Sequence, residues 1–280
     1  MGVRVEVMSK DPAVKESRKL AAERVLQEFD GKLPDLKLLA FFDDSDWAEL
    51  KSPQSLGLGN RGFYTRIDKN TFRGYLSLPR GLAEKIFGTN LWVPDSERFF
   101  DHLIYLHGTA SSSEVALAMV FAHELQHFVQ YGFKRKLWAE SKLIRRLPNE
   151  VQEKERLNWP DIPHERDARI VAKRVGVKLC GEDAVNRYVD RMIDEAQKRC
   201  INQMIGEGAT KMEMMEIEDL RFSRKLDSEI PYDLASGIEQ IYRRLRPYRR
   251  DFESALEKMR RDSVHKNDYE DVDLSAYFDG

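Results

Sequence analysis

The segment His123-Glu124-Leu125-Gln126-His127 has the residue types and spacing of a metal-dependent hydrolytic site, the pattern H-E-x-x-H. Successive residues of a helix are turned by about 100°, so His123 and His127 lie one turn apart on the same face. Two imidazoles in that arrangement can share one zinc ion, and Glu124 beside them has the chemistry of a general base. The spacing therefore predicts hydrolysis by a zinc-activated water.

The residues before this motif indicate a buried helix. Residues 115–122 are apolar nearly all round, which is typical of a helix covered on most sides. Ser111, followed three residues later by Glu114, has the spacing of a capping box, and Gly132 is suited to a helix end. The sequence therefore places the two histidines near the C-terminal end of a deep helix.

A catalytic zinc site usually has three protein ligands, and Glu165 is the candidate for the third. Pro163 suits a first helical turn, and small apolar residues follow at helical spacing: Ala168, Val171, Ala172 and Val175. Glu165 falls on the face of these residues, where a carboxylate needs a partner. Two alternatives stay open: His164 as the third ligand, and Glu165 as an ordinary first-turn glutamate favoured by the helix dipole.

Together the two motifs resemble the gluzincin metallopeptidases, particularly their minimal members. The resemblance covers residues 3–175 and rests on H-E-x-x-H and on a second helix of the form Pro-x-Glu-x-Asp/Glu-Ala. It implies His123, His127 and Glu165 as ligands of Zn²⁺ and Glu124 as the catalytic base. It also implies a zinc endopeptidase that acts on peptide or protein substrates.

The sequence departs from the family pattern beside the second motif. Many gluzincins have an acidic residue four positions after the ligand glutamate, where it supports a histidine, and this chain has Arg169 there. Asp167 is the nearest acid, but at two residues from the ligand on a helix it points elsewhere. A donor to the developing oxyanion is not singled out among the candidates Tyr131, Tyr188, Tyr232 and His164.

The residues ahead of the motif predict a small mixed sheet, so the expected fold class is α+β with a zincin-like sheet on the motif helix. Strands are expected at Val3–Met8, at 36–42 and 101–107, and in a hairpin of 62–68 and 71–78. An amphipathic helix is expected over 12–29, with an inner side of Val14, Leu20, Ala21, Val25, Leu26 and Phe29. By the resemblance, residues 103–106 are expected to form the edge strand that pairs with substrate.

The rest of the chain predicts helices. Residues 134–158 are rich in charge and are expected to form a solvated insertion, with a gating lid as the alternative. Helices are expected over 184–204, 211–222 and 234–263, with Pro247 kinking or dividing the last. The expected domains are a metallopeptidase domain, 1–180, and a helical subdomain with an acidic tail, 181–280.

Composition narrows the function classes. The chain has 280 residues, 41% of them hydrophobic, and a net charge of −2, which argues against a general nucleic-acid or acidic-membrane binder. Two cysteines, Cys180 and Cys200, suggest a reducing compartment. No secretory signal and no uncharged apolar run of about 18 residues is visible, so we expect a cytoplasmic protein without a membrane span.

Other interpretations remain for the same residues. His123 and His127 could be ordinary helix histidines that hydrogen-bond to backbone or water. His102, His107 and His265 are expected to be surface or hydrogen-bonded residues. A basic cluster, residues 242–250, mixes arginines with Tyr242 and Tyr248, and it supports a non-catalytic, zinc-containing module that binds protein or nucleic acid. A degenerate peptidase that keeps zinc only for binding is a third hypothesis, which the intact Glu124 opposes.

Overall fold

The computed structural model describes residues 2–43, 62–66, 101–108, 113–206, 217, 220–262 and 266–279. The chain forms two compact units, one of Met1–Phe128 with Lys178–Cys180 and one of Val129–Val177 with Gly181–Gly280. The division passes through two helices, α4 (Glu114–Phe133) and α7 (Pro163–Cys180). The predicted domain boundary at residue 180 stays a prediction.

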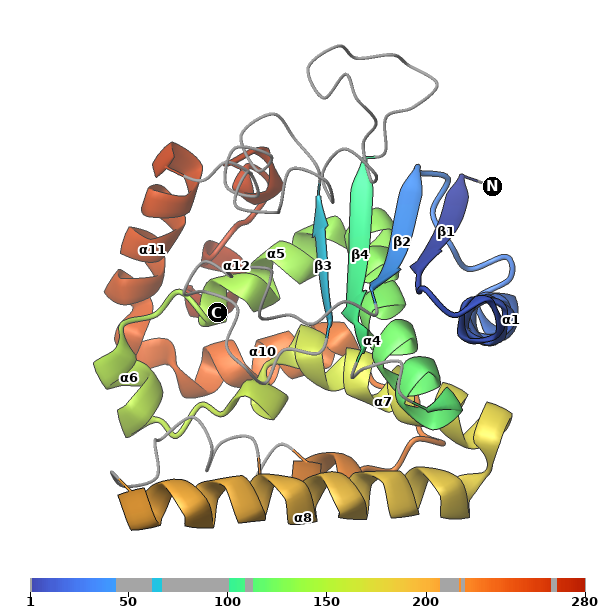
Figure 1. Ribbon diagram of the computed structural model, residues 1–280. Coiled ribbons are helices and arrows are strands. Elements are labelled where there is room, and N and C mark those ends of the chain that lie inside the picture. Colours follow the sequence, from blue (N-terminus) through green and yellow to red (C-terminus); the bar gives the residue numbers. More distant parts are fainter. Residues whose placement is uncertain are drawn as a thin grey trace. The chain divides into compact units, whose positions relative to one another are not determined.

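The first unit contains a four-stranded mixed sheet (Figure 1). Its strands are β1 (Val3–Met8), β2 (Leu38–Asp43), β3 (Gly62–Arg66) and β4 (His102–His107), in the order β1-β2-β4-β3. β1, β2 and β4 run parallel, and β3 pairs antiparallel with β4. The bounds predicted for β1 are confirmed, and β2 and β4 begin one or two residues later than expected.

Helix α4 packs on one face of this sheet. Phe42 of β2 meets Phe121 edge to face, with ring centroids 5.2 Å apart. His102 of β4 contacts Phe128 in the same manner at 5.0 Å. On the opposite face the ring of Tyr105 stacks with that of Phe41 at 5.8 Å. Because side chains are buried on both faces, β2 reads in the sequence as a continuous apolar run.

Helix α1 (Pro12–Glu28) follows β1 and confirms the helix expected there. Asp11 caps it by accepting from the amide of Ala13 at 2.8 Å, and Pro12 occupies the first turn, where its missing N–H costs nothing. Val25 and Phe29 are buried as expected. The inner position predicted for Leu20 is wrong, because its side chain is 52% exposed.

The edge-strand prediction for residues 103–106 is wrong. β4 pairs with β2 on one side and with β3 on the other, so its backbone hydrogen bonds are used within the sheet. An extended peptide cannot pair with a strand that already has two neighbours. The first half of the predicted hairpin is β3, and its second half, residues 71–78, lies outside the described residues.

The second unit is helical in its described part (Figure 1). Besides the end of α4 and most of α7 it contains α5 (Arg135–Ile144), α6 (Asn149–Lys154), α8 (Glu182–Gly206), α10 (Leu234–Arg244), α11 (Arg249–Asp262) and α12 (Ser275–Phe278). Its described residues also form short 3₁₀ turns at η2 (Trp159–Asp161), η3 (Arg246–Tyr248) and η4 (Lys266–Tyr269). Pro247 lies in η3 and divides α10 from α11, as predicted. Most of the helix expected over 211–222 lies outside the described residues.

The expectation that residues 134–158 are a solvated insertion is wrong. Trp138, Leu143, Ile144 and Leu147 are buried, so this segment forms part of the core of the second unit. A high content of charged residues does not require exposure of the whole segment, because long basic side chains can cover apolar surface with their stems. The Lys142 ammonium, for example, lies 4.1 Å from the ring centroid of Trp138.

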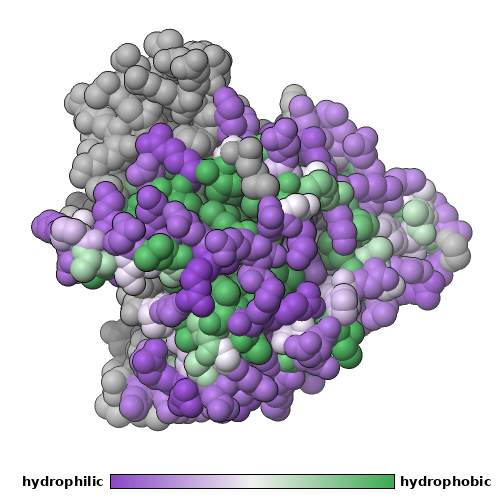
Figure 2. Space-filling view, turned by 90° about the vertical axis from the view of Figure 1, so that its right-hand side faces the viewer, coloured by the Kyte–Doolittle hydropathy of each residue, from purple (hydrophilic) through white to green (hydrophobic). Residues whose placement is uncertain are grey.

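The architecture is α+β: a mixed four-stranded sheet packed against α4, followed by a mainly helical C-terminal part. Among the described residues, no helix is long and apolar enough to cross a membrane. On the face drawn in Figure 2, hydrophilic side chains predominate and hydrophobic ones lie between them in patches.

Candidate metal centre

Helix α4 carries the H-E-x-x-H motif in its second half. Its first turn is capped by Ser113, whose hydroxyl oxygen accepts from the amide of Ala116 at 3.1 Å. The residue predicted for this role, Ser111, lies outside the described residues. The helix ends at Phe133, next to the expected Gly132. The motif thus begins nine residues after the helix start at Glu114 and ends six residues before its last residue.

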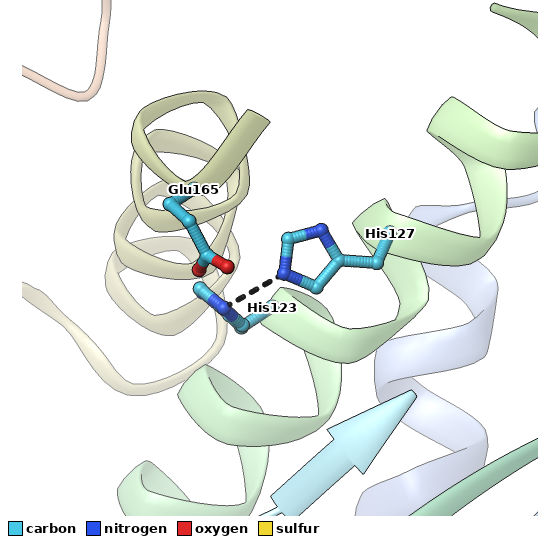
Figure 3. A group of neighbouring side chains, drawn as sticks. All are labelled: His123, His127 and Glu165. Carbon is cyan, nitrogen blue, oxygen red and sulfur yellow. Dashed lines mark hydrogen bonds between the residues drawn. The ribbon is translucent and has the colours of Figure 1, made fainter. Parts of the chain in front are cut away.

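The two histidines face each other across one helical turn, as their spacing predicts. Nε2 of His127 lies 3.1 Å from Nε2 of His123, and the ring planes are nearly perpendicular (Figure 3). Two ligand atoms on a tetrahedral zinc ion, each roughly 2.1 Å from the metal, are about 3.4 Å apart. The nitrogen atoms therefore already have close to the separation that zinc requires.

Glu165 comes from the first turn of α7. Ile162 precedes that helix in an extended conformation and Pro163 starts it, which sets the carboxylate two residues into the helix. Other residues of this turn are also buried, and Glu165 itself is only 4% exposed. A carboxylate at such a position needs charged or hydrogen-bonding partners.

His123, His127 and Glu165 lie together. Each offers one ligand atom, and these atoms are all within 4.8 Å of one another. Figure 3 shows the three side chains directed toward one another from two helices. Two imidazole nitrogens and one carboxylate oxygen are a donor set that suits zinc. This group could hold a metal ion.

Two cationic or proton-donating groups contact Glu165. Nη1 of Arg145 donates to Oε1 of Glu165 at 3.4 Å, and Nε2 of His164 lies 3.3 Å from the same oxygen. Burial lowers the pKa of the Arg145 guanidinium to about 10, while the Glu165 carboxylate acts in the opposite direction. Arg145 therefore remains protonated at neutral pH and offsets part of the cost of burying Glu165.

Asp167, the acid nearest to Glu165 in the sequence, is hydrogen-bonded to a residue of α4. Asp167 accepts a hydrogen bond from the Gln130 amide at 2.7 Å, and the same amide group donates to the carbonyl of His164 at 2.9 Å. Arg169, at the position where the family has an acid, donates to Ser223 at 3.4 Å. The surroundings of this centre thus differ from the family pattern that the sequence resembles.

Of the other candidate residues, Glu124 is buried on α4 at 7% exposure. His102 is also buried, and its Nδ1 lies 2.9 Å from the Tyr64 hydroxyl, which confirms a hydrogen-bonded role. Tyr131 packs edge to face on Trp138. Burial raises the pKa of Tyr232. The side chains of His107 and His265 lie outside the described part of the chain.

Three residues around the centre were not predicted from the sequence: Gln130, Ser141 and Arg145. A signal for Gln130 existed, because it is polar on a buried helix three residues after His127. Ser141 and Arg145 follow Trp138 at spacings of three and seven, so they share the buried face of α5 and its end. The high charge of that segment hid the pattern.

Comparison with known proteins identifies no family for this chain. No protein-family model matches the chain, and neither the curated proteins nor the solved structures contain a significant match.

Proposed function

We propose that this chain is a zinc-dependent metallopeptidase, an endopeptidase that hydrolyses peptide bonds in peptide or protein substrates. The observation that carries the proposal is the convergence of His123 and His127 from one helix with Glu165, 38 positions after His127, from another. The H-E-x-x-H spacing alone arises by chance in many chains. A buried carboxylate that meets the same two imidazoles is a much stronger restriction.

His123, His127 and Glu165 would hold the metal through two nitrogens and one oxygen, which leaves a fourth position of a tetrahedral site for water or substrate. A zinc ion bound there would supply Lewis acidity, polarising the substrate carbonyl and acidifying a water molecule. Burial of His127 and Glu165 would strengthen this effect because their surroundings are less polar than water.

Glu124 is the proposed general base. It directly follows His123 on α4 and is buried. It would take a proton from the attacking water and deliver the proton to the amine that leaves when the C–N bond breaks. A glutamine at this position keeps the size of the side chain but cannot carry the proton.

The alternative is a non-catalytic zinc-containing module that binds protein or nucleic acid. Tyr242 of the basic cluster is fully buried, stacked on Phe252 and Tyr277 at 4.5 Å each, so stacking on a base would require this core to open. Arg249 of the same cluster pairs with Glu253 at 2.7 Å. These contacts weigh against nucleic acid, and we propose no nucleic-acid or membrane partner and a cytoplasmic setting.

The test combines metal content with cleavage. Zinc per chain is measured by elemental mass spectrometry on wild type, His123→Ala, Glu165→Ala and the control His102→Gln, and cleavage of unfolded casein is followed with zinc added. We expect about one zinc in wild type and control, loss in the two ligand variants, and cleavage that Glu124→Gln abolishes although it retains zinc. Zinc without cleavage would favour the binding module, and no zinc in wild type would refute the proposal.

A further inference from the structure

One oxygen of Glu165 is held by two groups that lie outside the proposed ligand set. Oε1 is 3.3 Å from Nε2 of His164 and 3.4 Å from Nη1 of Arg145. Each contact is at the long end of the hydrogen-bond range and is weak alone. Together they approach the same atom, so rotation of the carboxylate would lose both.

The proton on His164 can be placed from its neighbours. A carboxylate oxygen only accepts, so Nε2 facing Glu165 must carry the proton. In the neutral ring Nδ1 is then an acceptor, and the Ser141 hydroxyl, 2.8 Å away, is its donor. The Ser141 oxygen also accepts from the amide of His164 at 3.0 Å. The contact with Glu165 thus sets the tautomer of this ring, and Ser141 fixes its orientation.

The side chain of Arg145 is restrained by the aromatic ring of Trp159. Its guanidinium carbon lies over the ring of Trp159, 3.2 Å from the ring centroid, in a cation–π contact. The residue directly follows α5, the helix that also carries Ser141. Helix α5 and the residue directly after it therefore supply both restraints on Glu165, Arg145 directly and Ser141 through His164.

We propose that His164 and Arg145 are positioning residues of the metal centre, which hold Oε1 of Glu165 so that the carboxylate is presented toward His123 and His127. This inference rests on the proposed metal site and extends it to the surrounding groups. It gives His164, which the sequence left open as a third ligand, a supporting role. Groups of this kind typically change metal affinity by about 10- to 100-fold when they are removed.

His164 gives a cleaner test than Arg145. The charge of Arg145 holds Glu165 but also repels a nearby cation, so its removal has two opposing effects on zinc affinity. In its neutral form the imidazole of His164 holds Glu165 without repelling a cation. A glutamine at 164 can place an amide N–H close to the position of Nε2, whereas leucine fills similar space without any donor.

The experiment measures the zinc dissociation constant of the full chain by competition with a chromophoric chelator, with no peptide present. The variants are His164→Leu, His164→Gln and Ser141→Ala. The matched control is His102→Leu, because His102 is also buried and also meets a hydroxyl through Nδ1. Urea unfolding of each variant accompanies the titration.

We expect His164→Leu to weaken zinc binding by about 10-fold or more, His164→Gln to stay within about 3-fold of wild type, and Ser141→Ala to fall between them. The control should keep its zinc affinity even where its stability falls. Should His164→Leu not fold, Ser141→Ala decides: an affinity equal to wild type overturns the proposal.

The proposal is also overturned by equal affinity in folded His164→Leu, by glutamine and leucine weakening zinc equally, or by absence of zinc binding in wild type. Failure of the peptidase proposal has a different signature, since wild type would then bind zinc, respond to these variants and cleave nothing.

Discussion

The Gln130 amide donates to Asp167 over 2.7 Å, and this bond joins the last turns of α4 to the first turns of α7. The second amide hydrogen goes to the carbonyl of His164 at 2.9 Å, so both donors of Gln130 are used. Gln130 is about one turn beyond His127, and Asp167 is two residues beyond Glu165. The bond therefore lies next to both metal-binding segments and fixes the end of one helix against the start of the other.

Replacing Gln130 by glutamate tests this link. A glutamate side chain has no N–H donors and would set a second carboxylate against Asp167, while the side-chain volume is nearly unchanged. We expect Gln130→Glu to lower the free energy of unfolding by roughly 2–4 kcal/mol in urea titrations at pH 7. Gln27→Glu, an exposed change on α1, should shift it by less than about 0.5 kcal/mol. Equal stabilities of the two variants would contradict the buried bond.

The N-cap of the motif helix should have a measurable effect. Ser113 accepts from the amide of Ala116, and alanine at 113 would leave that amide without its side-chain partner. We expect Ser113→Ala to cost about 1 kcal/mol of unfolding free energy in metal-free protein, and Ser113→Asp to cost much less because aspartate also caps. If the aspartate variant is as unstable as the alanine variant, capping is not the reason.

Tyr242 should be a stability residue and not a ligand-binding one. Its ring stacks on Phe252 and Tyr277, and its hydroxyl donates to the carbonyl of Glu140 at 3.0 Å. We expect Tyr242→Phe to cost about 1 kcal/mol and Tyr242→Ala about 3–5 kcal/mol in urea unfolding. A folded Tyr242→Ala variant with wild-type stability would disprove its place in the core.

Lys142 should make stability depend on pH. Burial, aided by the neighbouring charges of Arg145 and Arg146, lowers its pKa to about 8. Between pH 8 and about 10.4 the unfolded chain keeps the proton that the folded chain has released. Unfolding free energy therefore rises with pH across that window, by at most about 1.4 kcal/mol per pH unit for this one group.

Removing the charge of Lys142 should remove this rise. We expect Lys142→Met to be more stable than wild type by roughly 1–2 kcal/mol at pH 7, with the advantage disappearing by about pH 10.5. Lys142→Arg, which stays charged throughout, should lack the rise and be less stable than Lys142→Met at every pH. Urea unfolding at several pH values with a chelator present measures these free energies. The same dependence of unfolding free energy on pH in wild type and Lys142→Met would contradict the lowered pKa of Lys142.

Local patterns predicted most of the elements around the centre. Alternation located β1, the proline and the apolar period located α1, and the long apolar run located α4. These signals are local because strand and helix periods are set by the backbone. Leu20 shows the limit: it has the period of an inner residue, yet nothing in the described part covers it enough to bury its side chain.

Strand order could not be predicted in the same way. The sequence placed residues 103–106 in the strand before the motif helix, which is correct, and at the sheet edge, which is wrong. An edge differs from an interior strand only in its neighbours. Here the neighbour is β3, whose residues come about 40 positions earlier in the chain.

The sequence by itself determined the two metal-binding segments. A spacing of four puts His123 and His127 on one face of a helix in any fold, and the proline and small residues around Glu165 place it in the first turn of a buried one. Only the tertiary structure decided that the carboxylate meets the two imidazoles, and that Arg145, His164 and Gln130 surround it. The reason is that helical periodicity reports which face of a segment is buried, whereas the partner of a buried polar group comes from another segment, which packing alone selects.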